Sequence, residues 1–261
     1  MTELDGTPAG ADQLRPLALT NYGHFTSLRV EEDGRVRGLA LHLERLARDC
    51  RAVFGTDLDT ERVRGLVRRA VPAPPDGPVV VRVTVYDPAL DLGRPAAPAA
   101  PRVLVTTRPA GPLSPPPLRL RTLPYVRDQA AVKHVGLFGA LHARRAAQLR
   151  GADDALFTDR DGRVTEGPTW NVGFVDAADR VVWPEGDVLP GVTMALLRRL
   201  HPHTTGRVTP ADVAGMRAAF ATNTAVGVRE IAAVDGTALT TGHPVVAALR
   251  AAYRDLPGDP L

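Results

Sequence analysis

A single lysine stands among the basic residues of this 261-residue chain. Lysine and arginine together number 32, and Lys133 is the only lysine among them. An arginine guanidinium stays protonated at ordinary pH and cannot form a Schiff base, whereas a lysine amine can. Lys133 is therefore a candidate for amine chemistry, and the alternative is an incidental surface lysine in an arginine-rich protein.

Other residues in the sequence match the needs of pyridoxal phosphate (PLP). This cofactor requires a lysine amine, a carboxylate at the pyridine nitrogen, hydrogen-bond donors around the phosphate, and a cation to balance its charge. Lys133 can supply the amine and Glu166 the carboxylate. Donors are available in Gly191-Val192-Thr193, where a helix is predicted to begin, and in Thr222-Asn223-Thr224, where a strand is predicted to end. Arg45 can supply the cation, so the sequence predicts a PLP site.

The first half of the chain must position Arg45. Alternating or β-branched runs predict strands, and three- and four-residue apolar spacing predicts helices. Strands are expected at 17–20, 25–30, 35–37, 79–86 and 102–107, with a hairpin turn at Asp33-Gly34. Helices are expected at 39–53 and 61–71, the second ended by Pro72, with a turn at 74–78 and a loop at 87–101.

The second half must position Lys133, Glu166 and the phosphate donors. Helices are expected at 136–149, 191–200 and 245–253. Strands are expected at 118–122, 155–158, 172–175, 181–183, 218–222 and 226–234. The segment Asp-Gly-Arg-Val occurs at 33–36 and again at 161–164, which predicts the same hairpin turn twice.

Strands and helices do not alternate regularly, so the predicted fold class is α+β. Residues 1–14 are polar and small and are expected to form a loose arm. Five prolines between Pro109 and Pro117 predict a linker, which separates a small α/β domain at 15–108 from a large PLP-binding domain at 118–261.

Composition excludes several classes of protein. Apolar residues make up 44% and charged residues 23%, as in ordinary globular proteins. The arginines are interspersed with acids, so nucleic-acid binding is not expected. One cysteine, no signal-peptide pattern and no long apolar run predict a cytoplasmic protein without a membrane partner. His201 and His203 lack a third nearby ligand, so no metal site is predicted.

Five short segments, taken in order, resemble the class IV aminotransferases, which are the fold-type IV PLP enzymes. This family includes branched-chain and D-amino acid aminotransferases and aminodeoxychorismate lyase. The similarity extends from about residue 22 to residue 235, nearly the whole chain. The segments that carry it are His42-Leu43-Glu44-Arg45-Leu46, Lys133, 162–167 with Asn171, Leu189-Pro190-Gly191-Val192-Thr193, and Thr222-Asn223-Thr224 with Val234-Asp235-Gly236.

The resemblance implies roles for individual residues. Lys133 looks like the Schiff-base lysine that also moves protons, and Glu166 like the partner of the pyridine nitrogen. The residues that resemble phosphate ligands are Arg45, Val192, Thr193, Asn223 and Thr224. The residues expected near the substrate are Phe25, Ala225, Tyr86 and Arg94. The family also implies a small N-terminal α/β domain, a larger barrel-like domain, PLP between them, and a homodimer whose partner subunit closes the substrate pocket.

Some positions depart from the family pattern. Several relatives carry a tyrosine five residues after the lysine, where this chain has Phe138. Relatives often have Gly-Asp-Gly before the first substrate-facing strand, where this chain has Asn21-Tyr22-Gly23-His24. Arg82, Tyr86 and Arg94 lie in the region of a carboxylate-binding motif without matching it. The substrate is therefore not predicted beyond its class.

The leading functional prediction is an aminotransferase that moves an amino group between a small amino acid and a 2-keto acid. One alternative is a PLP-dependent lyase of the aminodeoxychorismate type, because Phe25-Thr26-Ser27 and the Lys133-His134 pair resemble that branch. A second alternative is a non-catalytic binding protein with the same fold.

Overall fold

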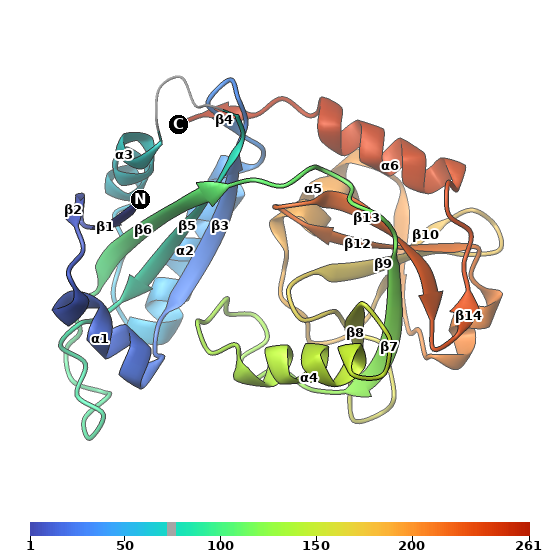
Figure 1. Cartoon of the computed structure of the whole chain (residues 1–261), viewed down its shortest axis with the longest axis horizontal. Coiled ribbons are helices and arrows are strands. Elements are labelled where there is room, and N and C mark those ends of the chain that lie inside the picture. The colour runs from blue at the N-terminus through green and yellow to red at the C-terminus, as the bar shows by residue number, and fades with distance from the viewer. Residues whose placement is uncertain (72–76) are drawn as a thin grey trace. The chain divides into compact units, whose positions relative to one another are not determined.

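The computed structural model describes residues 1–71 and 77–261 (Figure 1). The chain divides into two compact units. Unit 1 contains Met1–Gly111, Val132–Gly136 and Pro257–Leu261. Unit 2 contains Pro112–Ala131 and Leu137–Leu256. The predicted helix stop at Pro72 and most of the predicted turn at 74–78 lie outside the described residues.

Among its described residues, unit 1 forms a seven-stranded antiparallel sheet in the order β15-β4-β3-β5-β6-β1-β2. These strands are β1 (Thr2–Leu4), β2 (Thr7–Pro8), β3 (His24–Val30), β4 (Arg35–Val36), β5 (Val79–Tyr86), β6 (Arg102–Pro109) and β15 (Asp259–Pro260). The helices of this unit are α1 (Ala11–Thr20), α2 (Leu39–Phe54) and α3 (Thr60–Ala70).

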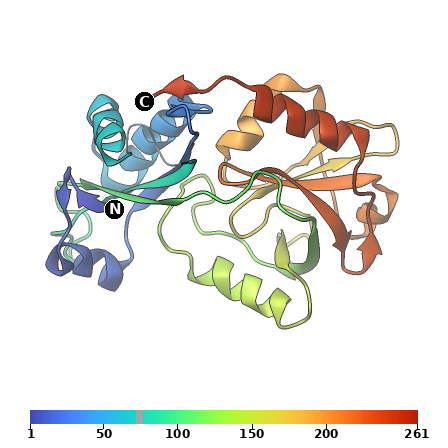
Figure 2. The same ribbon diagram turned by 45° about the horizontal axis from the view of Figure 1, so that its top comes forward.

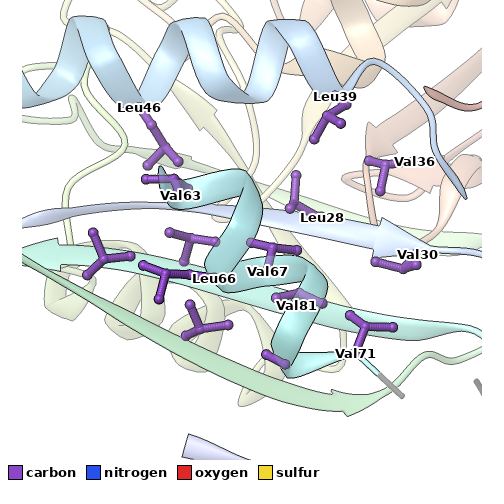
Figure 3. Packing of buried hydrophobic residues seen from close by; sticks show 14 of the residues in the cluster. Leu28, Val30, Val36, Leu39, Leu46, Val63, Leu66, Val67, Val71 and Val81 are labelled. Carbon is purple, nitrogen blue, oxygen red and sulfur yellow. The ribbon is translucent and has the colours of Figure 1, made fainter. Parts of the chain in front are cut away.

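Two helices cover one face of this sheet because their apolar residues recur every three or four positions. Leu39 and Leu46 of α2 and Val63, Leu66 and Val67 of α3 are buried in one cluster with alternate residues of β3, β5 and β6. Figure 3 shows these leucines and valines directed toward Leu28 and Val81 of the sheet. The β-branched residues of β5 alternate between this core and the opposite face, which leaves the opposite face for other side chains.

Unit 2 is built on a mixed sheet with the strand order β11-β10-β9-β12-β13-β7-β8, and β14 pairs with β13 at its side. These strands are β7 (Leu118–Pro124), β8 (Asp154–Thr158), β9 (Asn171–Val175), β10 (Val181–Pro184), β11 (His203–Gly206), β12 (Ala218–Asn223), β13 (Gly227–Val234) and β14 (Thr237–Ala238). The β7–β8, β7–β13 and β10–β11 pairs are parallel, and the remaining pairs are antiparallel.

Helices pack around the strands of unit 2. They are α4 (Phe138–Gln148), α5 (Val192–Leu200), α6 (Pro244–Asp255) and a 3-10 helix, η1 (Ala211–Gly215). Figures 1 and 2 show α4 beside β7 and β8, and α6 on the other side of the unit 2 strands. In the described part of the chain, no helix combines the length and apolar character needed to cross a bilayer.

Most predicted elements are present, and the α+β class is confirmed. The repeated Asp-Gly-Arg-Val segments form matching turns, in which Gly34 and Gly162 adopt φ angles of 76° and 75°. The Gly34 N–H donates to the Glu31 carbonyl, and the Gly162 N–H donates to the Asp159 carbonyl. A positive φ is accessible to glycine without a steric penalty, which explains why both turns use it.

The prediction for the first twenty residues is wrong in two ways. Residues 1–14 are not a loose arm, because β1 pairs with β6 and Leu4 is fully buried beside Tyr86 and Leu104. Residues 17–20 belong to α1 and are not a strand. Leu14 and Leu17 pack against the Leu4 cluster at helical spacing, whereas Leu19 is exposed, so the local alternation of Leu17 to Thr20 was misleading.

The two units also differ from the predicted domains. The break between Gly111 and Pro112 falls inside the proline-rich 109–117 segment. However, Val132–Gly136 and Pro257–Leu261 belong to unit 1 and not to a continuous 118–261 domain. Lys133, which the prediction assigns to the 118–261 domain, is therefore part of unit 1 and not of unit 2.

Candidate functional site

Lys133 is held in unit 1 by backbone hydrogen bonds. The Phe25 N–H donates to the Lys133 carbonyl at 2.8 Å, and the Val135 N–H donates to the Gly23 carbonyl at 2.9 Å. The Lys133 N–H donates to Oδ2 of Asp49 on α2 at 2.9 Å. Its Nζ lies 4.8 Å from the centroid of the Phe25 ring. The lysine is therefore anchored on both sides of its peptide, by a strand and by a helix.

Arg45 lies on a buried polar stripe of α2. His42, Arg45 and Asp49 are spaced three and four residues apart, so they share one face of the helix. Arg45 Nη2 donates to the Thr26 hydroxyl at 2.5 Å, and that hydroxyl lies 2.8 Å from His42 Nδ1. Burial lowers the pKa of Arg45 to about 10, while Asp49 opposes this change. The guanidinium is therefore charged at neutral pH.

The residues predicted near the substrate are only partly brought together. Phe25 lies beside Lys133, and the guanidinium carbon of Arg82 lies 3.6 Å from the Phe25 ring centroid. By contrast, the Tyr86 hydroxyl donates to the Gln13 carbonyl at 2.8 Å, and its ring is buried with Leu4 and Leu104. Arg94 is exposed in the loop after β5. Phe25 therefore contacts both Lys133 and Arg82, whereas Tyr86 is directed into another cluster of unit 1 and Arg94 is exposed.

Glu166 is the buried carboxylate of unit 2. Its Oε1 accepts from Arg127 Nε at 2.9 Å. Its Oε2 accepts from the Leu189 N–H at 3.2 Å and from Asn171 Nδ2 at 3.3 Å. These three donors hold the carboxylate in a fixed orientation inside unit 2.

A tight turn carries Glu166. The Gly167 N–H donates to the Trp170 carbonyl at 2.9 Å, and Trp170 folds back so that a Cβ on Gly167 would lie 2.0 Å from its indole ring. The indole N–H donates to Asp154 Oδ2 at 2.8 Å. Arg144 of α4 pairs with the same carboxylate and also donates to the Thr169 hydroxyl. These contacts explain why Gly167, Thr169 and Trp170 follow Glu166.

The start of α5 presents the predicted phosphate donors Val192 and Thr193. The first N–H groups of a helix have no partner within the helix, and they attract anions. Gly191 precedes them, and its backbone approaches the amide oxygen of Asn171 so closely that a Cβ would lie 2.0 Å from it. The Thr193 hydroxyl is buried and has no hydrogen-bond partner among the described residues.

The turn after β12 holds the second predicted donor set. The Asn223 side-chain oxygen accepts from the N–H groups of Ala225 and Val226, both at 3.0 Å. Asn223 therefore shapes this turn, and Thr224 and Ala225 lie within it. The hydroxyl of Thr222, one residue before Asn223, is also buried without a partner in the described part of the chain.

Three of the buried polar atoms without partners suit a phosphate group. The unpartnered atoms of the described residues include the hydroxyls of Thr193 and Thr222 in unit 2 and the Nε of Arg45 in unit 1. A buried donor without a partner costs free energy, and such groups commonly mark a place for water, an ion or a ligand. Hydroxyl, amide and guanidinium donors are the groups that bind phosphate oxygens.

Sequence reasoning missed two residues that contact the predicted site. Asp49 accepts the Lys133 N–H, and its place on the helix face of Arg45 was a usable signal. Arg127 pairs with Glu166, and nothing in the sequence distinguishes it from the other arginines.

Comparison with known proteins agrees with this geometry. Residues 23–234 match the family model described as "Amino-transferase class IV". The chain belongs to the class IV aminotransferase family. The family, α+β fold class, enzyme class and cofactor predicted from the sequence are thereby confirmed at the level of the family. No protein in a curated collection matches the chain.

Solved class IV aminotransferase structures share the fold of the chain. A branched-chain aminotransferase from Thermoproteus uzoniensis with norvaline has a TM-score of 0.84 at 21% identity, covering 97% of this chain and 93% of that one. A PLP-bound hypothetical aminotransferase from Mycobacterium tuberculosis has a TM-score of 0.81 at 20% identity, covering 97% of each chain. A protein described as a candidate 4-amino-4-deoxychorismate lyase from Legionella pneumophila has a TM-score of 0.78 at 22% identity, covering 93% of each chain.

Proposed function

We propose that this class IV aminotransferase binds PLP through Lys133 and transfers an amino group between a small amino acid and a 2-keto acid. The observation that carries the proposal is the only lysine of the chain, anchored by two elements and lying against Phe25. When bound, PLP supplies an electron-accepting ring that stabilises negative charge at the substrate α-carbon. The chain must supply the groups that hold this ring and move protons.

Lys133 would hold the cofactor, and its amine would move a proton to and from the α-carbon of the substrate. Glu166 would accept a hydrogen bond from the pyridine nitrogen and favour its protonated form. Its own orientation is fixed by Arg127, Leu189 and Asn171. An anionic carboxylate is suited to this role, because it favours the protonated ring over the neutral one.

We propose four phosphate ligands for their chemistry. They are the Arg45 guanidinium, the Val192 N–H, the Thr193 hydroxyl and Thr224. We assign Asn223 the role of shaping the Thr224 turn, because its amide oxygen already accepts two backbone N–H groups. The Thr193 hydroxyl, buried without a partner in the described part of the chain, supports this assignment.

For the substrate we propose Phe25 as an apolar contact and Arg82 as a cation for a carboxylate, since both lie on the side of the sheet where Nζ of Lys133 is found. Norvaline and 2-oxoglutarate are suitable first probes, because structures of similar proteins contain them. We also propose that the protein is a homodimer, which sedimentation at micromolar concentration tests, and that it is cytoplasmic, which fractionation of cells tests.

Cofactor attachment is tested by borohydride reduction followed by peptide mapping. The reduced protein is expected to carry one pyridoxyl group, on the peptide that contains Lys133. The variant Lys133→Ala is expected to remain unlabelled and colourless. A wild-type protein that takes up no PLP, or that is labelled only at its N-terminus, contradicts the proposal.

Transfer is tested by a single turnover without a keto acid. At least one amino acid in a panel of D and L forms is expected to convert the bound cofactor completely to its amine form. Added pyruvate or 2-oxoglutarate should then restore the visible absorbance. The alternative, a pyruvate-releasing lyase, has the candidate Legionella lyase as its structural support. The lyase function replaces the proposed aminotransferase function if aminodeoxychorismate yields pyruvate while no amino acid changes the absorbance spectrum of the bound cofactor.

A further inference from the structure

Asp49 is a buried carboxylate next to the lysine, outside the segments that resemble the family. It lies on α2, one turn after Arg45, and its side chain is 1% exposed. Oδ2 accepts the Lys133 N–H at 2.9 Å. Oδ1 accepts Nε and Nη2 of Arg48 at 3.0 and 2.7 Å. The carboxylate therefore links a helix to a segment 84 positions away in the sequence.

A purely local role does not explain this placement. Burying a carboxylate costs several kcal/mol unless ionic and hydrogen-bond partners compensate. Arg48 compensates from the outer side, where its own side chain is 49% exposed. The inner oxygen is directed at the peptide of the only lysine, which has Phe25 on its other side. The buried carboxylate thus holds the Lys133 peptide against α2.

The charge of Asp49 also acts on this part of unit 1. It raises the pKa of both Arg45 and His24, opposing the larger effect of burial. Burial lowers the pKa of His42, and the charges of Arg45 and Lys133 lower it further. The charged or titratable groups of unit 1 around the lysine are His24 of β3, Arg82 of β5, His134 of its own segment, and His42, Arg45, Arg48 and Asp49 of α2. Asp49 is the anion of this group.

We propose that Asp49 is a positioning residue for the catalytic lysine: its Oδ2 fixes the Lys133 backbone, and its negative charge stabilises the protonated amine. The catalytic role of Lys133 in this proposal rests on the proposed function. The contact itself, and the effect of the charge on the amine, do not depend on PLP, so they can be measured separately.

The single lysine makes a direct measurement possible. In the apoprotein, an amine-acylating reagent can modify only Lys133 and the N-terminal amine, which peptide mapping separates. The labelling rate of Lys133 as a function of pH gives the pKa of its amine. In Asp49→Asn we expect this pKa to fall by about one unit, because the nearby cations lose their balancing charge. Asp57→Asn, which removes an exposed partner of Arg51 just beyond the same helix, is the matched control and should change nothing.

Positioning is tested by hydrogen exchange at the Lys133 amide and by PLP affinity. Asparagine keeps an oxygen that can accept the Lys133 N–H, and exposed Arg48 can turn toward solvent. Asp49→Asn should therefore retain amide protection, whereas Asp49→Ala should lose it and bind PLP at least tenfold more weakly. Melting curves establish that each variant is folded.

The two proposals fail in different ways. An unchanged Lys133 pKa in Asp49→Asn, or full amide protection in a folded Asp49→Ala, overturns the role of Asp49. Failure of the wild-type protein to take up PLP overturns the proposed function, whatever the labelling shows.

Discussion

At the scale of single residues, His24 is the clearest case of a buried group without a partner. It is fully buried, and neither ring nitrogen has a hydrogen-bond partner among the described residues. Burial lowers its pKa from 6.5 to about 4, and the charge of Asp49 opposes this only in part. The imidazole is therefore neutral at pH 7 and resists protonation in the folded protein.

This pKa predicts a loss of stability in acid. Between pH 6.5 and pH 4 the unfolded chain binds a proton at His24 that the folded protein does not bind, so the free energy of unfolding falls as the pH falls. A shift from 6.5 to about 4 corresponds to on the order of 3 kcal/mol. We expect the free energy of unfolding, measured by urea denaturation at pH 7, 5.5 and 4.5, to decrease less in His24→Leu than in wild type.

The control for this prediction is His142→Gln, which changes an exposed histidine of α4 and should leave the difference between wild type and His24→Leu as it is. Some pH dependence should remain in His24→Leu, because burial also lowers the pKa of His42. Equal slopes in wild type and His24→Leu would show that His24 is protonated in the folded protein.

At the scale of secondary-structure elements, the start of α5 is coupled to the turn that carries Glu166. Asn171 makes this connection, because Nδ2 donates to Glu166 and to the Leu189 carbonyl while Oδ1 faces Gly191. Gly191 has a φ of −68°, so glycine is needed there for space and not for backbone conformation. The start of α5, where we propose phosphate donors, and the orientation of Glu166 thus depend on one close contact.

Gly191→Ala should weaken both functions of this element. The new Cβ would lie 2.0 Å from Asn171 Oδ1, so Asn171 must move away from Glu166. We expect a loss of about 1–3 kcal/mol in unfolding free energy, as for overpacked sites, together with weaker PLP binding. Chemical denaturation and a spectroscopic PLP titration measure the two effects.

A second alanine substitution provides the comparison. Gly215→Ala places a Cβ with nothing within 4 Å and should change stability by less than about 0.5 kcal/mol. In an Asn171→Ala background the cost of Gly191→Ala should shrink, because the clashing oxygen is gone. An equal cost in both backgrounds would mean that Asn171 is not the obstacle.

At the scale of the whole molecule, the last five residues belong to unit 1 although they follow α6 of unit 2. β15 pairs with β4, and Leu261 packs against the buried cluster of unit 1. Oδ2 of Asp259 accepts the N–H of Leu39, the first residue of α2, at 3.1 Å. The end of the chain therefore stabilises the helix that carries Arg45 and Asp49.

Removal of residues 257–261 should destabilise unit 1 selectively. Loss of a helix cap costs about 1 kcal/mol, and exposure of a leucine costs about another 1–2 kcal/mol. Hydrogen exchange should accelerate in α2 while the β9–β12 pair of unit 2 keeps its protection. Asp259→Ala should lose only the free energy that the helix cap contributes, about 1 kcal/mol. Exchange that accelerates equally in both units would contradict a local role.

Local information in the sequence determined much of this protein. Valine-rich β5 and the leucine periodicity of α2 appear where the pattern predicts them, because these elements bury one face and their spacing reflects it. The isolation of Lys133 and the order of the short segments around Glu166 and Thr193 identified the family, because cofactor chemistry requires particular residue types.

Tertiary structure decided what depends on contacts between distant segments. Lys133 belongs to unit 1 only because its peptide pairs with β3 and Asp49, and Leu4 is in a core only because β1 pairs with β6. Arg127 differs from the other arginines through its contact with Glu166, 39 positions later. Such contacts depend on the burial and hydrogen bonding of the whole fold, so they cannot be predicted from a local pattern of residues.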